Sequence, residues 1–369
     1  MEINGEHGST RVLSSGLGLG HYLPALAIRD ELCLMGIDAG VDVYEEHLGP
    51  ARRSRIDVTK RAYRRDDRLA RVGERLSGSL APELDEESLA AVAAWWETQR
   101  AERFIVLSGY WWQAVESYWS KLWPRRCAIH WCHIDAAESP SWKTVPGKNH
   151  GQHVWPASAA RGEVTSWIRM SQRAVKPVTE RPRRFLVHGG GWGLGAYREA
   201  AADLLSSGNE VDVIVSEASD AGTSAGGARF FHDDPDWRPW SRGANGQFGF
   251  PPVSQVGPGI VPHYARMSEC SGVFELISEC WAVISKPGGA TLWDAMTSCI
   301  AFIFLPAHGP HEARNADLWC ALGWGLRYDE WRKNGFPLEP LAEIHRKLLA
   351  AVERLPVYTE ILAGGRSSR

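Results

Sequence analysis

The chain has 369 residues and a mass of 40.9 kDa, which suggests two domains at roughly 100–200 residues per domain. With 44% apolar and 23% charged residues it has the composition of a folded globular protein, which excludes disordered, collagen-like and coiled-coil chains. A formal net charge of −3 gives no overall attraction to nucleic acid or to an anionic membrane, so we expect no nucleic-acid partner. No run approaches the roughly 18 apolar residues of a membrane-spanning helix, and residues 1–11 are polar, so we expect no transmembrane segment, no signal peptide and a cytoplasmic location.

Two similar glycine-rich segments, 175 positions apart, organise the chain. In each, a short apolar run enters a glycine-rich turn and is followed by a helical pattern, a glycine and a second β-type run. The first copy predicts a helix over Leu23–Met35 and a strand over Val41–Tyr44; the second predicts a helix over Tyr197–Leu205 and a strand over Val211–Val215. Such βαβ openings predict an α/β protein with two Rossmann-like domains that face each other across a cleft.

The remaining elements follow in chain order. In the first half we expect a helix over Glu86–Arg100 and strands over Phe104–Leu107 and Cys127–Ile134, then a linker near Arg173–Arg183. The polar stretch Glu217–Gly259 is too long for an ordinary connection, which indicates a mobile functional loop or an insertion. The later pattern predicts helices and strands in alternation, over Met267–Glu279, Trp281–Ser285, Thr291–Ser298 and Ile300–Leu305, and a closing amphipathic helix over Leu338–Leu355. The expected domains are 1–175 and 182–345, with 346–369 as a C-terminal helix and tail that crosses back to the first domain.

The first glycine-rich segment, Gly16-x-Gly-x-Gly20-His21, combines close-approach glycines with a histidine. Pro24 lies near the expected first helical turn, where its missing N–H costs nothing. Free N–H groups at a helix N-terminus favour an anion, and a histidine there can act as a base near neutral pH. The alternative is a tight βα turn beside a surface histidine.

The strongest signal is the run from Ser285 through Gly288, Gly289 and Thr291, followed by the run from Phe304 to Asn315. A strand that ends in serine, a Gly-Gly turn and a threonine on a new helix provide N–H and hydroxyl donors suited to a diphosphate. Asp294 lies one helical turn further on, within reach of a ribose diol. The alternative is a Gly-Gly pair that simply ends a strand.

These two regions, Gly16–Leu32 and Ala282–Asn315, resemble the GT-B glycosyltransferases, and within them the MurG-type and monogalactosyldiacylglycerol synthase branch. The resemblance implies an inverting, metal-independent transfer from a nucleotide diphosphate sugar, with a UDP- or TDP-sugar expected, to a small-molecule acceptor in secondary metabolism. It implies no cofactor and no metal, an acceptor-binding first domain and a donor-binding second domain.

The resemblance also implies residue roles. His21 would be the base beside the acceptor, with Asp135 orienting it or contacting the acceptor; the alternative for Asp135 is a helix cap. The donor would be held by Gly20, Gly190, Gly191, Ser285, Gly288, Gly289, Ala290, Thr291, Asp294, His311, Glu312 and Asn315. Asp294 stands where the family usually has Glu, and His311 stands where a sugar-contacting Gln is common.

Three alternative functions are compatible with the same residues. In a nucleotide-sugar hydrolase or epimerase, His21 would activate water, and sugar release without an acceptor would reveal it. A nicotinamide-dependent oxidoreductase is suggested by Gly191-x-Gly193-x-x-Ala196, with acids at Asp42, Asp212 and Glu217, although His21 replaces the third glycine of the first loop. A catalytically silent partner of another transferase is the fourth possibility.

Several further features have competing interpretations. The seven cysteines are widely spaced, which favours reduced, buried thiols. Half of the 18 tryptophans lie within 95–155, either as core or as a stacking platform for an acceptor. The Arg-rich stretch 52–75 is interpreted as a solvated helical face, with an anionic acceptor or a membrane surface as the alternative contact. Asp234-Pro-Asp236 is interpreted as a loop turn rather than a metal site. A zinc site that joins the strand Cys127–Asp135 to His150 and His153 is disfavoured, because alternation puts His133 and Asp135 on one face of the strand and His130 and Cys132 on the other.

Overall fold

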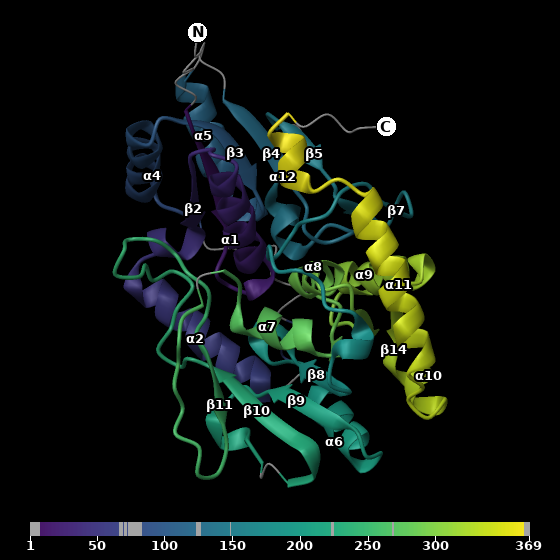
Figure 1. Ribbon diagram of the computed structural model, residues 1–369. Helices are drawn as coiled ribbons and strands as arrows, with labels where there is room; N and C mark the ends of the chain where they lie inside the picture. Colours follow the sequence, from purple (N-terminus) through teal and green to yellow (C-terminus); the bar gives the residue numbers. More distant parts are fainter. Residues whose placement is uncertain are drawn as a thin grey trace.

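The computed structural model describes residues 8–65, 69, 72, 83–122, 127–147, 149–222, 225–267 and 269–364. Its first half forms a five-stranded parallel sheet in the order β2-β1-β3-β4-β5 (Figure 1). The strands are β1 (Ser9–Ser14), β2 (Ala39–Val43), β3 (Ala101–Val106), β4 (Ala128–Cys132) and β5 (Gln152–Val154). The helices of this half are α1 (Leu19–Leu34), α2 (Pro50–Arg65), α4 (Glu86–Thr98) and α5 (Trp112–Leu122). A small hairpin, β6 (Ala157–Ser158) and β7 (Glu163–Val164), follows.

The second half forms a seven-stranded sheet in the order β11-β10-β9-β8-β12-β13-β14, parallel except for the edge strand β11. The strands are β8 (Arg184–His188), β9 (Glu210–Ile214), β10 (Ala228–Asp233), β11 (Val253–Val256), β12 (Ala282–Ser285), β13 (Ala301–Phe304) and β14 (Gly325–Arg327). The helices are α6 (Tyr197–Ser206), α7 (Gly272–Glu279), α8 (Gly289–Thr297), α9 (Pro310–Leu322), α10 (Tyr328–Lys333), α11 (Glu339–Arg354) and α12 (Tyr358–Leu362). Without β11 this is the doubly wound Rossmann order, whose strand order reverses between β8 and β12.

The two halves pack directly against each other, which confirms the expected two-sheet α/β architecture. The Trp293 indole of α8 donates to the Ile134 carbonyl at 3.0 Å, and the Met170 amide donates to Thr297 Oγ1 at 3.0 Å. After α11 the chain crosses back, as expected, and α12 lies beside the first sheet (Figure 1). There the Thr359 hydroxyl donates to Glu31 of α1 at 2.6 Å.

Some predicted boundaries were wrong for local reasons. Helix α1 begins at Leu19 rather than Leu23, so His21 lies in its first turn and Pro24 in its second. Helix α8 begins at Gly289, two residues before the predicted start. Helix α7 begins at Gly272, because the Ser271 side chain caps it by accepting from the Phe274 amide at 3.0 Å. The polar stretch 217–259 contains two strands, β10 and β11, and is therefore not a structureless loop.

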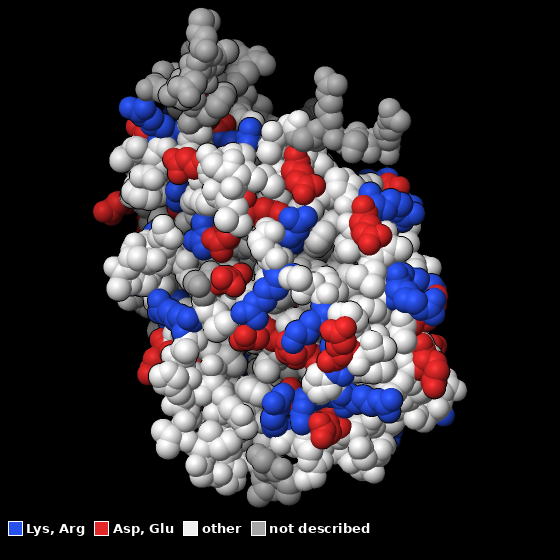
Figure 2. All heavy atoms as spheres, viewed as in Figure 1, with Lys and Arg blue, Asp and Glu red and all other residues white. Residues whose placement is uncertain are grey.

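Most of the tryptophan-rich region forms the core of the first half. Trp96, Trp111 and Trp131 are fully buried and Trp142 nearly so, which favours packing over an acceptor platform. All seven cysteines are free thiols, five of them buried, as expected. No helix in the described ranges is long and apolar enough to cross a membrane. Figure 2 shows Lys and Arg interspersed with Asp and Glu on one face of the molecule, with no large area of a single sign.

A buried ion pair fixes the first sheet. The Arg11 guanidinium donates twice to the Asp42 carboxylate, at 2.6 and 3.0 Å, and the Trp96 indole donates to the same group at 2.9 Å. Burial alone would raise the pKa of Asp42, but Arg11 and the indole N–H hold it below its ordinary value. The role of Asp42 is therefore to stabilise this sheet through its pairing with Arg11.

We predict that Asp42→Asn lowers the free energy of unfolding by about 3–5 kcal/mol, because it leaves the Arg11 charge buried without its partner. Urea unfolding measures the change. The control is Asp38→Asn, an exposed acid just before the same strand, which should stay within about 0.5 kcal/mol of the parent. Equal effects of the two substitutions would contradict the structural role of the pair.

Candidate functional site

The loops that follow the parallel strands of both sheets meet in one place. The first glycine loop (Ser15–Gly18) touches the second glycine loop (Gly189–Ala196): a Cβ on Gly191 would lie 2.9 Å from Leu19 Cγ, and one on Gly18 would lie 3.1 Å from Trp192 Nε1. Side chains at Gly18 and Gly191 would force the loops apart. The two glycine-rich segments found in the sequence therefore act at a single junction.

His21 and Asp135 approach each other on the first-half side of this junction. His21 is half-buried in the first turn of α1, and Asp135 is buried just beyond β4. Burial lowers the pKa of His21, while the Asp135 carboxylate raises it and His311 lowers it further. His21 therefore lies within electrostatic range of both residues, and its imidazole is held in the neutral form that can accept a proton.

Asn315 of α9 ties this pair to the second half. Its amide nitrogen donates to Asp135 Oδ1 at 2.7 Å and to the Pro287 carbonyl at 2.9 Å. Its amide oxygen accepts from the Ala136 amide at 2.7 Å. The side chain is fully buried. Protein partners thus occupy both ends of the Asn315 amide, so in this arrangement it positions Asp135; a role in holding the donor stays a prediction.

The N-terminus of α8 faces the junction from the second half. Its N-cap is Gly288 in an extended conformation with no side-chain cap, and Gly289, Ala290 and Thr291 form the buried first turn. Ser285 is fully buried at the end of β12, with its Oγ 3.5 Å from His188 Nδ1. Uncapped N–H groups at a helix N-terminus attract an anion.

Lys286 is a residue that the sequence analysis missed. It follows Ser285 directly, and its Nζ would lie 4.0 Å from a Cβ on Gly288 while its Cε would lie 3.3 Å from one on Gly190. The ammonium pairs with Glu312, which also accepts from the His308 amide at 2.8 Å. Burial alone would raise the pKa of Glu312, but the nearby Lys286 and His311 charges and these hydrogen bonds lower it to about 2. The sequence could have identified Lys286 by its position, because it is a cation between Ser285 and the Gly288-Gly289 pair.

His188 is a second missed residue, at the switch point of the second sheet. Burial and the Lys286 charge lower its pKa to about 4, so the imidazole is neutral. Its Nδ1 accepts from the Gly190 amide at 3.0 Å, which places the proton on Nε2. Nε2 is buried with no hydrogen-bond partner among the described residues. Its position at the end of β8, where the strand order reverses, was the signal.

Asp294 is buried inside α8 and only 3% exposed. Its Oδ1 has no hydrogen-bond partner within the described ranges, and burial raises the pKa of the carboxyl to about 8. An unpartnered buried carboxyl is costly unless it is neutral or meets a ligand. Its role toward a ribose stays a prediction.

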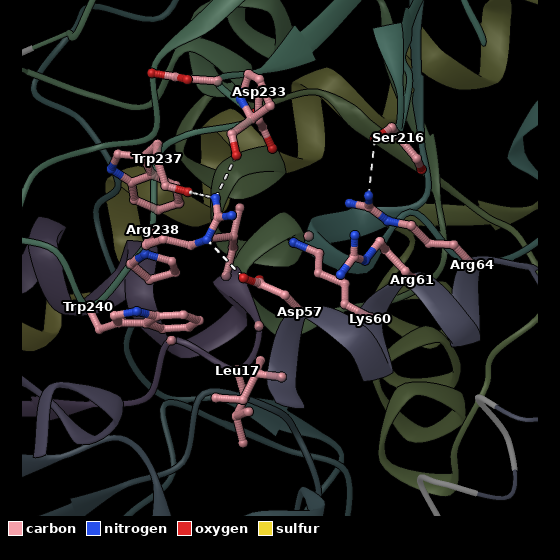
Figure 3. A pocket seen from close by; sticks show the side chains of 18 of the residues that line it. Leu17, Asp57, Lys60, Arg61, Arg64, Ser216, Asp233, Trp237, Arg238 and Trp240 are labelled. Atoms are coloured by element: carbon pink, nitrogen blue, oxygen red, sulfur yellow. Dashed lines mark hydrogen bonds and ion pairs between the residues drawn. The ribbon is translucent and has the colours of Figure 1, made fainter. Parts of the chain in front are cut away.

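A pocket of about 270 Å³ opens beside the glycine loops, between α2 and the ends of β9 and β10 (Figure 3). Arg64 of α2 reaches across it, donating to the Trp192 carbonyl at 3.0 Å and to the Ser216 carbonyl at 3.1 Å. The interpretation of this stretch as a solvated face is therefore wrong for Arg64 and for half-buried Lys60, whereas Arg61 also lines the pocket but is exposed as expected. The expected stretch beyond Arg65 lies mostly outside the described residues.

Three alternatives from the sequence can be compared with the geometry. Asp42 and Asp212, the acids that would bind a dinucleotide ribose, are buried and paired with arginines. In Asp234-Pro-Asp236, the Asp234 carboxylate accepts from the Asp236 amide at 2.9 Å, as a turn requires. His133 Nε2 lies 2.9 Å from His153 Nδ1, but no cluster of three metal-ligating groups occurs in the part of the chain that the structure describes.

Neither a family model nor a curated protein matches the sequence. Solved structures match over nearly the whole chain. The Streptomyces sp. SF2575 glycosyltransferase SsfS6, complexed with thymidine diphosphate, has a TM-score of 0.58 at 14% identity, covering 97% of this chain and 99% of that one. Spinosyn forosaminyltransferase SpnP has a TM-score of 0.54 at 13% identity, covering 96% and 98%. Spinosyn rhamnosyltransferase SpnG, complexed with spinosyn aglycone, has a TM-score of 0.51 at 12% identity, covering 96% and 99%.

These similarities, at low identity, establish the fold. The chain has the GT-B fold that its sequence led us to expect. Which branch it resembles most, and the individual roles of the site residues, stay predictions.

We predict that stability depends on pH through Asp294. Its folded pKa of about 8 lies above the ordinary value of 3.8, so the folded state binds a proton that the unfolded state releases. The free energy of unfolding should therefore fall as the pH rises from about 4 to about 8. Asp294→Asn should remove this slope and be more stable than the parent at pH 8, as urea unfolding at several pH values would show. A parent and variant with parallel pH profiles would contradict the prediction.

The contact between the glycine loops gives a matched pair of substitutions. A Cβ on Gly191 meets Leu19, whereas a Cβ on Gly20 meets nothing within 4 Å. We expect Gly191→Ala to lower the free energy of unfolding by about 1–3 kcal/mol through overpacking. Gly20→Ala, in the first turn of α1, should change it by less than about 1 kcal/mol. Thermal unfolding of both variants tests the contact, and a harmless Gly191→Ala would refute it.

Proposed function

We propose that this chain is an inverting, metal-independent glycosyltransferase that moves a sugar from a nucleoside diphosphate sugar to a small-molecule acceptor. The carrying observation is the bridge through Asn315, which holds the His21–Asp135 pair of one half against the Lys286–Gly289 turn of the other. A base and an anion-binding turn thus face the same junction. The expected cytoplasmic location and the assignment of domains 1–175 and 182–345 to acceptor and donor belong to this proposal.

His21 acts on the acceptor. As the acceptor oxygen or nitrogen attacks the anomeric carbon, neutral His21 takes its proton, and the Asp135 carboxylate stabilises the imidazolium that forms. The new bond forms on the face opposite the departing diphosphate, so one displacement inverts the anomeric centre. The bond from the anomeric carbon to the phosphate oxygen breaks, and its electron pair leaves with the diphosphate.

The second half stabilises that negative charge. The Lys286 ammonium and the uncapped N–H groups of α8 lie on the same turn, next to Gly190 of the second glycine loop. A helix N-terminus carries about half a positive charge, and the Lys286 ammonium, which is paired with Glu312, adds a donor that can turn toward the diphosphate. Together they supply the charge compensation that a divalent cation gives in other transferases.

The nucleoside would lie further along the second half. His188 Nε2 and Asp294 Oδ1 are both buried polar atoms without partners in the described chain. A sugar hydroxyl or a base edge can satisfy such atoms. Thymidine diphosphate in SsfS6 supports a TDP-sugar donor, and the spinosyn enzymes support a role in secondary metabolism.

Donor binding requires the two halves to separate. A Cβ on Gly289 would lie 2.8 Å from Asp135 Oδ1, so no phosphate fits between these two residues as they stand. A phosphate beside Gly289 therefore means that Asp135 moves away. Such motion commonly accompanies donor entry and product release.

The first test is thermal unfolding with UDP, TDP, GDP, NAD and NADP in parallel. A ligand at about 100 times its dissociation constant adds roughly 2.7 kcal/mol of stability. We expect one nucleoside diphosphate, TDP in particular, to raise the melting temperature. A response to NAD or NADP alone would instead favour the oxidoreductase and overturn the proposal.

His21→Ala should lower transfer by about 100-fold or more, as loss of a general base does, while the thermal shift with TDP persists. Lys286→Met should instead weaken the TDP shift. The control is His263→Ala, an exposed histidine outside the junction, which should leave both readouts unchanged. Full transfer by His21→Ala would refute its role.

Release of free sugar without any acceptor separates a hydrolase from a transferase. Nuclear magnetic resonance of the product anomer then tests inversion, because a retained anomeric configuration contradicts a single displacement.

A further inference from the structure

We propose that the 270 Å³ pocket between α2 and the ends of β9 and β10 binds the acceptor, and that this acceptor is a flat aromatic molecule carrying a carboxylate. The inference rests on the proposed function, because it names the substrate class of the same cleft. It is carried by two opposed walls of the pocket, one cationic and one aromatic, which Figure 3 shows facing each other.

The cationic wall comes from one face of α2. Arg64 lies four positions after Lys60 and three after Arg61, so on the helix surface it neighbours both. Arg64 is anchored by backbone carbonyls and by Glu217 at 3.2 Å. The side chains of Lys60 and Arg61 make no hydrogen bond or ion pair with any residue that the structure describes. Their charges are therefore available to a ligand.

Lys60 is the more sheltered of these two cations. It is half-buried, and burial together with the nearby Arg64 charge lowers its pKa to about 8, although the Asp233 and Asp57 carboxylates act in the opposite direction. A cation whose charge is disfavoured by its surroundings gains most from an incoming anion.

The acids of the pocket offset this charge only in part, although Asp233 and Asp57 lie within electrostatic range of Lys60. Asp57 is paired with Arg238 at 3.1 Å, and Glu217 with Arg64. Asp234 accepts a hydrogen bond from its own turn. Burial raises the pKa of Asp233, so its carboxyl holds a proton more readily than an exposed acid.

The aromatic wall comes from the loop after β10. Trp237 and Trp240 are half-buried and line the side of the pocket opposite the α2 cations, with the paired Arg238 and Asp57 between them (Figure 3). Trp237 is fixed by an edge contact with Tyr22 of α1, at 5.6 Å between ring centroids. Indole rings offer apolar area to a flat ring at a low conformational cost.

The size and position of the pocket suit an acceptor. About 270 Å³ lies just below the usual range for drug-sized ligands, which admits a fused two-ring system but not a nucleotide sugar. The first glycine loop forms one wall, and Leu19, which also lines the pocket, lies two residues before His21. A ligand anchored at α2 would direct its other end past Leu19 toward the base.

The test is isothermal titration calorimetry with 2-naphthoate and with its neutral isostere 2-naphthamide. We expect the parent protein to bind the carboxylate at least about tenfold more tightly than the amide, because only the carboxylate pairs with the cations. The double variant Lys60→Met/Arg61→Met should lose that preference and retain its affinity for the amide. Arg64 is left intact because it also holds the loops together.

The matched control is Arg55→Met, an exposed arginine of the same helix that does not line the pocket, and it should behave as the parent. Equal affinity for acid and amide in the parent, or an unchanged preference in the double variant, would overturn the proposal.

TDP added to the same titrations separates this inference from the proposed function. Binding of 2-naphthoate that TDP displaces would make the pocket part of the donor site and overturn the acceptor assignment. A protein that prefers 2-naphthoate to the amide but gives no thermal shift with any nucleoside diphosphate would support the pocket and refute the glycosyltransferase.

Discussion

The Asn315 amide is the interaction on which the junction depends. With three hydrogen bonds it fixes Asp135 and Ala136 of one half and Pro287 of the other at a single buried point. A primary amide suits this position because it offers an acceptor and two donors without a charge. Two features of the junction depend on its placement: Asp135 is held within electrostatic range of His21, and Pro287, just before α8, is brought up to the first half.

Charge in the cleft is divided between two regions. Toward α8 and α9, Lys286 forms an ion pair with Glu312, so the two charges nearly cancel when no ligand is bound. When an anion enters, the Lys286 ammonium can turn toward it. Toward α2, the side chains of Lys60 and Arg61 form no ion pair with a residue that the structure describes. An enzyme that must bind a dianionic donor and release a diphosphate carrying one more negative charge benefits from the first arrangement, since a permanently unpaired cation would hold the product too tightly. The second arrangement suits a substrate recognised by a single negative charge.

The sequence predicted those parts of the site that local patterns encode. Gly16–Gly20 and Gly189–Gly195 are glycine-rich because backbones meet there, and the run from Ser285 to Thr291 carries the strand, turn and helix start in order. It could not predict pairings across the two halves: Asn315 meets Asp135 over 180 positions, and Arg64 meets Ser216 over 152. The prediction of a solvated face for helix α2 failed in part because a run of arginines has the same sequence pattern whether it faces water or a neighbouring domain. Strands β10 and β11 were missed because they lie within a polar stretch, and Lys286 and His188 because only the fold gives them neighbours.

The chain passes between the two halves twice, and the two passages lie against each other. Trp167, on the way out, pairs with Val357 on the way back; its amide donates to the Pro356 carbonyl at 3.2 Å and its carbonyl accepts from the Tyr358 amide at 2.8 Å. Two covalent connections joined at one flank leave the halves free to rotate about that flank but not to slide apart. Opening of the cleft would therefore be a hinge motion with its axis along this paired segment. The same geometry places an anchor of that axis outside the cleft, because Thr359 of α12 donates to Glu31 of α1 directly after the paired segment.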